Sequence, residues 1–359
     1  MKSIIKVFLT YLIAIIINIF LWNLIVETFI FKSSGGYFDK EIGKRGISYK
    51  HSVWSSEGYS NLILDSLGFN NYPYKLEKDP NQKRVVIIGD SFTEAFQVDR
   101  DSNFVTLLGK SLGSGYEVLN FGISGATMSD HIYTSNFISK KLDPDIIILE
   151  VNTLADFGSE NFNPQNWLHI ENDKNSYKIS SNYSLDKKTK IKNFLYNFSG
   201  LSGYAIVRFK ELIYSIKRFS SVDNSSNKSF DLQKKKEELE NLVSWELSCL
   251  KKNYTNIVVI SLDNLPIIED NKFKLPNKSV SRKFEEDLIK SKLLSENIEL
   301  IEVEKKIMEL SLKNRISYIG ANNKKVGFGH LNNKGHRVVS KILYDYVKNM
   351  FNNLPSERG

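Results

Sequence analysis

The apolar run Val85–Ile88 ends abruptly in Gly89-Asp90-Ser91, and this change constrains how the chain can fold. A short run of β-branched residues between charged residues and Gly-Asp predicts a buried parallel strand, and the residues that follow are typical of a helix start. Ser91 is therefore expected at a strand-to-helix turn, beside the free N–H groups of a helix N-terminus. An ordinary helix N-cap gives the same short pattern, so the rest of the chain decides between the two interpretations.

Further strand-like runs follow, with amphipathic segments of helical spacing between or after them. Strands are expected at Glu117–Asn120, Asp145–Val151, Asn256–Leu262 and Ile298–Val303, and helices at Leu232–Lys252, Ser281–Ser295 and Lys334–Met350. This alternation predicts βαβ units and the α/β fold class, with three α/β/α layers around a central, mostly parallel, five-stranded sheet. Ligands of such sheets bind at the carboxyl ends of the strands, where Ser91 is expected.

Cysteine and histidine are too sparse to suggest a metal site. The only cysteine, Cys249, excludes an intrachain disulfide and a cysteine-rich metal site. The five histidines include no pair at the spacing of metal ligands. We therefore expect no metal and no cofactor.

The N-terminal segment predicts a membrane anchor. Twenty uncharged residues run from Val7 to Val26, enough at about 1.5 Å per residue to cross a hydrocarbon core of about 30 Å. The alternative is a cleaved signal peptide, but the run exceeds the usual apolar region of about 7–15 residues, and no small-residue cleavage site follows. With Lys2 and Lys6 ahead of the span, we expect a single-pass protein of the inner or plasma membrane whose body is periplasmic or extracellular.

The sequence predicts an anchor at 1–34, a lead-in extension at 35–82 and the main domain at 83–355. An insertion at about 157–230 interrupts the alternation of strands and helices. Within it, Lys187–Arg218 carries eight Lys or Arg and one Glu among aromatic residues, so most of the net charge of +8 is local. This segment could rest on anionic lipid, bind an acidic glycan, or be a lid helix with solvated lysines. Nucleic acid is not expected as a partner of a translocated domain.

Further polar blocks are expected at the same sheet edge as Ser91. The second strand ends in Asn120-Phe-Gly122-Ile-Ser-Gly125, a turn that can present a backbone N–H to a ligand. The third strand ends near Asn152. Near the end of the chain, Gly327-Phe-Gly-His330-Leu-Asn-Asn-Lys-Gly335-His336 places a histidine just before the last helix.

These blocks resemble blocks one, two and five of the SGNH/GDSL hydrolase superfamily, in composition and in order. The matching patterns are Gly-Asp-Ser, Asn-x-Gly-x-x-Gly and His-Leu-Asn-x-x-Gly-His. The resemblance runs from about Leu62 to Val347, with the insertion outside it. In more detail, the chain is similar to membrane-anchored bacterial members that occur with cell-envelope and surface-polysaccharide functions.

The resemblance implies a flavodoxin-like SGNH fold and a role for each matching residue. Ser91 matches the nucleophile that attacks an ester carbonyl, and its backbone N–H and that of Gly125 match two oxyanion donors. His330 matches the general base, which takes the serine proton and then protonates the leaving alkoxide. His336, in the Gly-His pair, is expected to be structural.

Two positions depart from the family pattern. The Asp that the family has three residues before the catalytic histidine is Gly327 here. The Asn of block three falls on Leu154 or Ala155, and Asn152, which shares a strand face with Leu154, is the candidate third oxyanion donor. We therefore expect a Ser–His dyad, in which a backbone carbonyl or another side chain could orient His330.

The implied function is that of a serine-dependent ester hydrolase or O-acyltransferase acting on O-acyl groups, most often O-acetyl, of a cell-surface glycan. Hydrolysis and transfer share an acyl-enzyme and differ in whether water or a sugar hydroxyl resolves it. Two alternatives stay open. One is a noncatalytic glycan-binding or assembly protein with a degenerate site, which the missing Asp and Asn favour. The other is a lipid esterase, which the anchor and the basic aromatic insertion favour.

Overall fold

The computed structural model describes residues 2–158, 167–173, 176–181, 187–220, 232–254, 256–262, 265–321, 323 and 326–353. Its centre is a five-stranded sheet in the order β13-β10-β7-β5-β6, with every neighbouring pair parallel. The strands are β5 (Lys83–Gly89), β6 (Tyr116–Gly122), β7 (Ile146–Val151), β10 (Ile257–Ser261) and β13 (Glu299–Glu302). The predicted fold class is confirmed, and each predicted strand is present to within two residues at either end.

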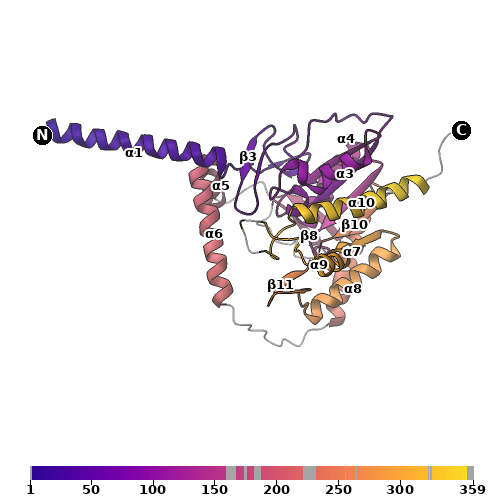
Figure 1. Ribbon diagram of the computed structural model, residues 1–359. Coiled ribbons are helices and arrows are strands. Elements are labelled where there is room, and N and C mark those ends of the chain that lie inside the picture. The colour runs from indigo at the N-terminus through magenta and orange to yellow at the C-terminus, as the bar shows by residue number, and fades with distance from the viewer. Residues whose placement is uncertain are drawn as a thin grey trace.

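Helices cover both faces of the sheet, as Figure 1 shows. One face packs against α4 (Met128–Lys141), α7 (Leu232–Lys251) and α8 (Val280–Ser295). The other packs against α3 (Phe104–Leu112), α9 (Val303–Asn314) and α10 (Asn333–Asn353). Strand β5 shows why both layers form: Val86 and Ile88 belong to one core, Val85 and Ile87 to the other, and none is exposed. A parallel strand needs this continuous apolar run because both of its faces are buried.

The order of the strands in the sheet indicates where a ligand site can form. Counted along the chain, the five strands lie in the order 2-1-3-4-5, so the connections leave β5 and β7 toward opposite sides of the sheet. A crevice opens at such a switch point, beyond the carboxyl ends of the strands. Short helices follow both strands there: α2 (Ser91–Glu94) after β5 and the 3-10 helix η2 (Leu154–Asp156) after β7.

The lead-in forms two antiparallel hairpins that pack against the main domain. They are β1 (Tyr37–Asp39) with β2 (Gly43–Arg45), and β3 (His51–Trp54) with β4 (Ser60–Ile63). After them, the side-chain oxygen and nitrogen of Asn71 pair with the backbone N–H and carbonyl of Asn120 on β6. The lead-in thus packs against the main domain, whereas the domain boundaries themselves stay a prediction.

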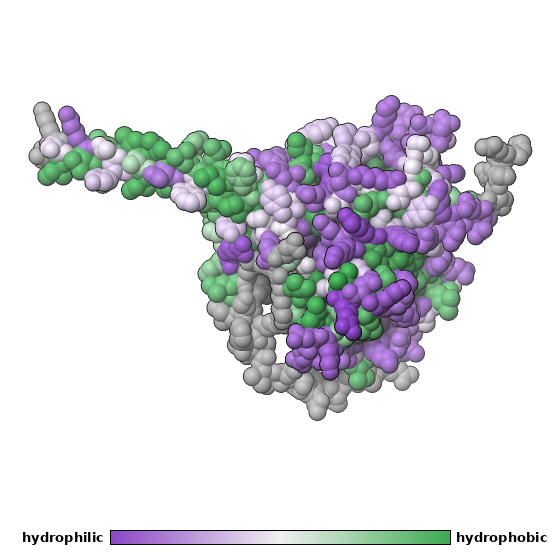
Figure 2. Space-filling model, viewed as in Figure 1, coloured by the Kyte–Doolittle hydropathy of each residue, from purple (hydrophilic) through white to green (hydrophobic). Residues whose placement is uncertain are grey.

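The remaining elements lie before the lead-in, around the sheet and in the insertion. They are α1 (Lys2–Phe29), η1 (Arg100–Ser102), β8 (Leu168–Asp173), β9 (Ser176–Ser181), α5 (Lys187–Phe198), α6 (Gly200–Ser220), β11 (Ile267–Glu269) and β12 (Lys272–Lys274). Among the described helices, α1 alone is long and apolar enough to cross a membrane, a property that signal sequences share. Its apolar side chains are exposed along most of its length, and it projects away from the body (Figure 2).

Arg84, at the start of β5, is a charged residue inside the core. Its side chain is 1% exposed. The guanidinium forms an ion pair with Glu117 and donates to four backbone carbonyls, those of Lys75, Leu76, Glu77 and Leu142. Buried charge is tolerated only when it is paired in this way. Arg84 thus ties the end of the lead-in to the amino-terminal edge of the sheet.

Replacing this arginine tests the attachment. Arg84→Met leaves four carbonyls and the Glu117 carboxylate without their donor, so we expect a loss of about 3–5 kcal/mol in the free energy of unfolding. The control is Lys83→Met, because the Lys83 side chain is 55% exposed and its ion pair with Asp145 is worth about 1 kcal/mol or less. Denaturant unfolding of the detergent-solubilised chain, followed by tryptophan fluorescence, measures both. Equal losses in the two variants would contradict this account.

Candidate active site

Ser91 lies at the turn from β5 into α2, at the carboxyl edge of the sheet. Asp90 caps the helix, since its carboxylate accepts from the Phe92 N–H at 2.8 Å. Glycine is required at 89 because a Cβ there would overlap Thr93 and the Glu150 carboxylate. Because Asp90 caps the helix, the Ser91 hydroxyl is not needed as a cap and can point toward the edge of the sheet.

The hydroxyl of Ser91 meets His330, although the two residues are 239 positions apart. The distance from Ser91 Oγ to His330 Nε2 is 2.8 Å. The imidazole packs on the Phe92 ring, with 4.8 Å between the centroids. Gly327 and Gly329 both have positive φ, +83° and +91°, and let the loop turn His330 toward the sheet edge before α10 begins. The structure thus brings together the two residues that the sequence predicted to act as a pair.

Glu57 completes a chain of three side chains that the sequence did not predict. It lies in the turn of the β3–β4 hairpin, and its Oε2 is 2.8 Å from His330 Nδ1. Its Oε1 accepts from the backbone N–H of His330 at 2.7 Å. A Cβ at position 329 would overlap this carboxylate, so Gly329 is what lets Glu57 approach. The structure thus adds an acid from the lead-in to the expected Ser–His pair, since Gly327 offers no carboxylate.

Little in the sequence indicates that Glu57 is the acid beside His330. Glu57 and His330 are 273 residues apart, and no local motif links them. One weak signal was available, because a histidine without its usual aspartate leaves a role to be filled by another carboxylate. The lead-in carries several, and only the tertiary structure selects among them.

The Gly122–Gly125 turn presents a second backbone N–H group, that of Gly125, at the carboxyl edge of the sheet. Gly125 has a φ of +66°. The turn is fixed from two sides: Glu94 accepts from the Ser124 N–H at 3.1 Å, and Lys44 Nζ donates to the Gly125 carbonyl at 3.0 Å. Within the described residues, no acceptor pairs with the backbone N–H of Ser91 or of Gly125. Both predicted oxyanion donors are therefore available to a ligand, and their role in catalysis stays a prediction.

Asn152 lies one residue beyond the end of β7 and is exposed. It lines a cavity of about 510 Å³ together with Phe92 and Gly329, the neighbours of Ser91 and His330. Leu154, one of the two positions where the family's Asn would fall, is buried in the core. Asn152 is thus placed beside the catalytic candidates, and its predicted contact with an oxyanion remains to be tested.

Acidic groups beneath Ser91 are held away from solvent. Glu150, on β7, accepts from the Asp90 N–H and the Thr93 hydroxyl. Burial and then the neighbouring Asp90 carboxylate raise the pKa of Glu150 well above its usual range. Burial also raises the pKa of Glu94. Glu150 thus holds the turn at Ser91, and Glu94 holds the turn at Gly125.

His336 occupies a structural position, as expected. It is fully buried, its Nδ1 accepts from the Phe104 N–H at 3.2 Å, and its ring stacks on that of Phe104. Burial lowers the pKa of His336 to about 3. The imidazole is therefore neutral at physiological pH and joins the start of α10 to α3.

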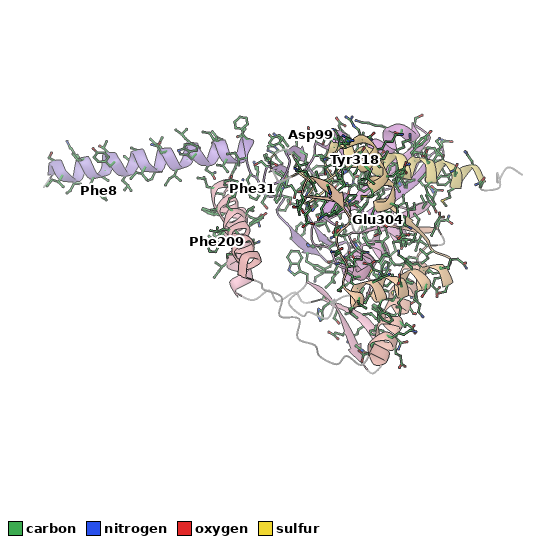
Figure 3. The ribbon with its side chains drawn as sticks, turned by 60° about the horizontal axis from the view of Figure 1, so that its bottom comes forward. Phe8, Phe31, Asp99, Phe209, Glu304 and Tyr318 are labelled. Carbon is green, nitrogen blue, oxygen red and sulfur yellow. The ribbon has the colours of Figure 1, made fainter. Side chains whose placement is uncertain are left out.

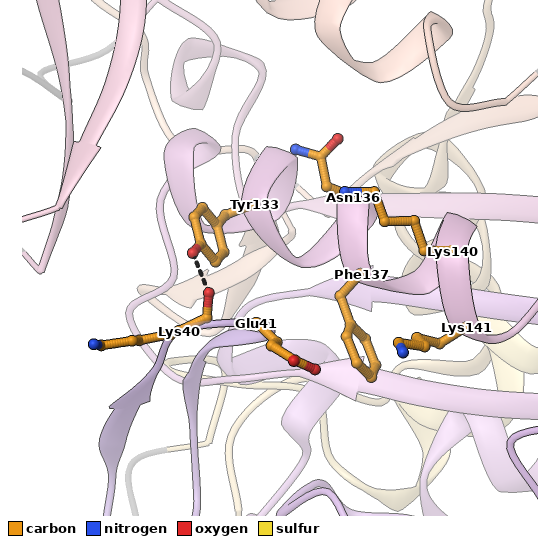
Figure 4. A pocket seen from close by; sticks show the side chains of 7 residues that line it. All are labelled: Lys40, Glu41, Tyr133, Asn136, Phe137, Lys140 and Lys141. Atoms are coloured by element: carbon orange, nitrogen blue, oxygen red, sulfur yellow. Dashed lines mark hydrogen bonds between the residues drawn. The ribbon is translucent and has the colours of Figure 1, made fainter.

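A second cavity, of about 500 Å³, lies away from these residues. Figure 4 shows it between the first hairpin and α4, with the Tyr133 hydroxyl donating to the Lys40 carbonyl. Among the described residues, no group of three or more His, Cys, Asp or Glu side chains could hold a metal ion.

The chain matches no protein-family model and no curated protein sequence. Solved structures do resemble it. An acetyl xylan esterase is 17% identical, with 74% of this chain and 99% of that chain covered and a TM-score of 0.39. A lipolytic protein of the G-D-S-L family from Veillonella parvula is 12% identical, covering 76% and 100%, with a TM-score of 0.38. A carbohydrate acetylesterase family member from Sinorhizobium meliloti is 13% identical, covering 76% and 100%, with a TM-score of 0.36.

Glu57 can be tested as the group that orients His330. A carboxylate only accepts hydrogen bonds, so it keeps the proton on Nδ1 and leaves Nε2 free to take the serine proton. Glu57→Gln can favour the wrong tautomer, and we expect kcat for an activated ester to fall by about 10²- to 10⁴-fold. Glu57→Asp should recover part of the loss.

Glu41→Gln serves as the matched control, because Glu41 is an exposed carboxylate of the same lead-in. Rates with p-nitrophenyl acetate and the pH profile of kcat would be measured on the detergent-solubilised chain. An unchanged kcat in Glu57→Gln would remove Glu57 from the site.

Proposed function

We propose that this protein is a serine esterase or O-acyltransferase of the SGNH type that uses Ser91, His330 and Glu57. The observation that carries this proposal is the unbroken chain of hydrogen bonds from Ser91 Oγ through His330 to Glu57. The backbone N–H groups of Ser91 and Gly125 lie at the same edge of the sheet, and neither pairs with an acceptor among the described residues. A nucleophile, a base, an orienting acid and oxyanion donors are the parts that acyl transfer needs.

The proposed reaction has two steps. Ser91 Oγ attacks the ester carbonyl carbon while His330 Nε2 takes the serine proton, and the Ser91 and Gly125 N–H groups stabilise the oxyanion. The bond from the carbonyl carbon to the alkoxide then breaks, and His330 gives its proton to the leaving oxygen. Water or a second hydroxyl group resolves the acyl-enzyme by the same route. Glu57 stabilises the imidazolium in both steps.

The proposed substrate is an O-acylated, most often O-acetylated, cell-surface glycan. Its support is the cavity beside the nucleophile, whose lining includes the polar residues Asn152, Asn277 and Arg282 among apolar ones. Side chains of this kind hydrogen-bond to the hydroxyl groups of sugars. The alternative of a noncatalytic glycan-binding protein is less well supported now that an acid stands at His330. A lipid esterase has one observation in its favour, since Lys32, three residues past α1, pairs with Val53 in the hairpin that carries Glu57.

We also propose that α1 is a retained single-pass anchor in the inner or plasma membrane, with the body in the periplasm or outside the cell. The supports are the length and apolarity of the helix and the lysines at its amino-terminal end, Lys2 and Lys6.

Serine reactivity tests the enzymatic proposal. A fluorophosphonate probe should label Ser91, with the site mapped by mass spectrometry, and Ser91→Ala should abolish the label. Ser91→Ala and His330→Ala should each remove nearly all ester cleavage or transfer, and the double variant should be scarcely worse, because residues that serve one step are strongly non-additive. Normal activity of Ser91→Ala would refute the mechanism and favour the glycan-binding alternative.

Reporter fusions test the anchor. With a fusion joint after Gly35, alkaline phosphatase should be active and a cytoplasm-dependent fluorescent protein dark, because the joint is expected outside the cytoplasm. N-terminal sequencing of the mature protein should find α1 retained. A fluorescent cytoplasmic reporter, or a mature N-terminus beyond Val26, would overturn this topology.

A further inference from the structure

Helices α5 and α6 of the insertion are attached to the end of α1 rather than to the catalytic edge. Two side chains of α1 cap α6: Glu27 Oε1 accepts from the Gly200 N–H at 2.9 Å, and Asn23 Oδ1 accepts from the Leu201 N–H at 3.2 Å. Gly203 lies so close to the Phe31 ring that a Cβ would overlap it. The Tyr196 ring of α5 packs edge-on against Phe31, with 5.6 Å between the centroids.

The direction of α6 follows from this attachment. In Figure 1, α6 begins at the end of α1 and runs crosswise to it. Figure 3, turned by 60°, keeps this arrangement, with Phe8 far out on α1, Phe31 at the junction and Phe209 on α6. A helix that lies crosswise to a membrane-spanning helix, at the end of the span, runs along the membrane surface.

Both helices expose apolar side chains that nothing in the described part of the chain covers. On α5 the exposed residues are Ile191, Phe194, Leu195 and Phe198, with exposed fractions from 43% to 68%. Their spacing of three, four and seven residues puts them on one stripe of the helix. On α6 they are Phe209, Leu212 and Ile213, exposed by 63%, 56% and 37%. A cluster of this kind marks a surface that meets a partner or a membrane.

The charge of the two helices identifies the partner. Residues 187–218 hold eight Lys or Arg and one Glu, and Arg208 and Lys210 stand on either side of Phe209 in the sequence. An apolar stripe combined with many basic residues is typical of helices that lie in the headgroup region of a membrane with anionic lipids. An acidic polysaccharide would pair with the charges but would not bury the phenylalanines.

We propose that α5 and α6 form a second membrane contact, in which their apolar side chains enter the headgroup region of a bilayer that carries anionic lipid. The contact rests on the proposed α1 anchor and adds to it: one helix holds the protein in the membrane, and the other two fix its orientation there.

This orientation places the active site near the membrane surface. The chain that leaves α1 pairs at once with β3, since Lys32 and Val53 exchange backbone hydrogen bonds of 2.8 and 3.0 Å. Glu57 is four residues beyond Val53, at most about 14 Å of extended chain. The contact would thus favour acyl donors or glycans that are still held at the bilayer over soluble ones.

Fluorescence quenching in vesicles tests this contact on the full chain. Cys249→Ser gives a background without cysteine, in which Phe194→Cys and Phe209→Cys each carry an environment-sensitive NBD label. In vesicles of phosphatidylcholine with phosphatidylglycerol, both labels should shift to the blue and be quenched several-fold more by nitroxide lipids than in phosphatidylcholine alone. The expected depth is about 5–10 Å below the headgroup level.

Two further labels separate the contact from the anchor. Ile13→Cys, within α1, should be quenched in both lipid mixtures, whereas Val280→Cys, 88% exposed on α8, should stay in water. If Ile13 is quenched while positions 194 and 209 behave like 280, the anchor stands and the proposed contact is refuted. If Ile13 is not quenched, the anchor fails and the contact with it. Labels that respond only to a soluble acidic polysaccharide would assign the surface to a glycan.

A charge placed in the stripe gives an independent check. The pair Phe194→Glu and Phe198→Glu should abolish most of the quenching at position 209 and leave that at position 13 unchanged. Leu312→Glu is the matched control, because Leu312 is 57% exposed on α9 of the body. Unchanged quenching at 209 in the double variant would count against the proposal.

Discussion

The hydrogen-bonded pair of Glu57 and His330 joins the two parts of the molecule from which the site is built. His330 comes from the last loop of the α/β domain, whereas Glu57 comes from a hairpin that precedes the domain in the chain. Two bonds to one carboxylate fix both the backbone and the ring of the histidine. An imidazole held in this way can accept a proton from Ser91 without first losing rotational freedom, which is what preorganisation contributes to catalysis.

The rest of the lead-in supports the same edge of the sheet. Lys44, on β2, donates to the carbonyls of Ser124 and Gly125 and so holds the turn that presents the second N–H group. Asn71 pairs with both backbone groups of Asn120 at the end of β6. The segment between the apolar N-terminal helix and the α/β domain therefore forms part of the wall of the candidate active site.

Much of the fold was predictable because its signals are local. The run Val85–Ile88 predicts a strand buried on both faces, and its alternating side chains do enter two separate cores. Gly89 and Gly125 marked turns, and Gly125 has a positive φ. In the sequence, Arg84 indicates only the start of the strand. Its burial could not be predicted, because four of its partners are carbonyls that the fold alone brings to it.

By itself, the sequence determined the parallel α/β sheet, the long apolar N-terminal segment, and the pairing of Ser91 with His330, since apolar periodicity and short motifs depend on neighbours along the chain. Only the tertiary structure decided which acid serves the histidine and where the basic insertion lies. Glu57 contacts His330, which is 273 residues away in the chain. Likewise, the first N–H groups of α6 are capped by side chains of α1 that lie more than 170 residues earlier. Contacts at such separations leave no periodic or local pattern, because they depend on how completed elements pack.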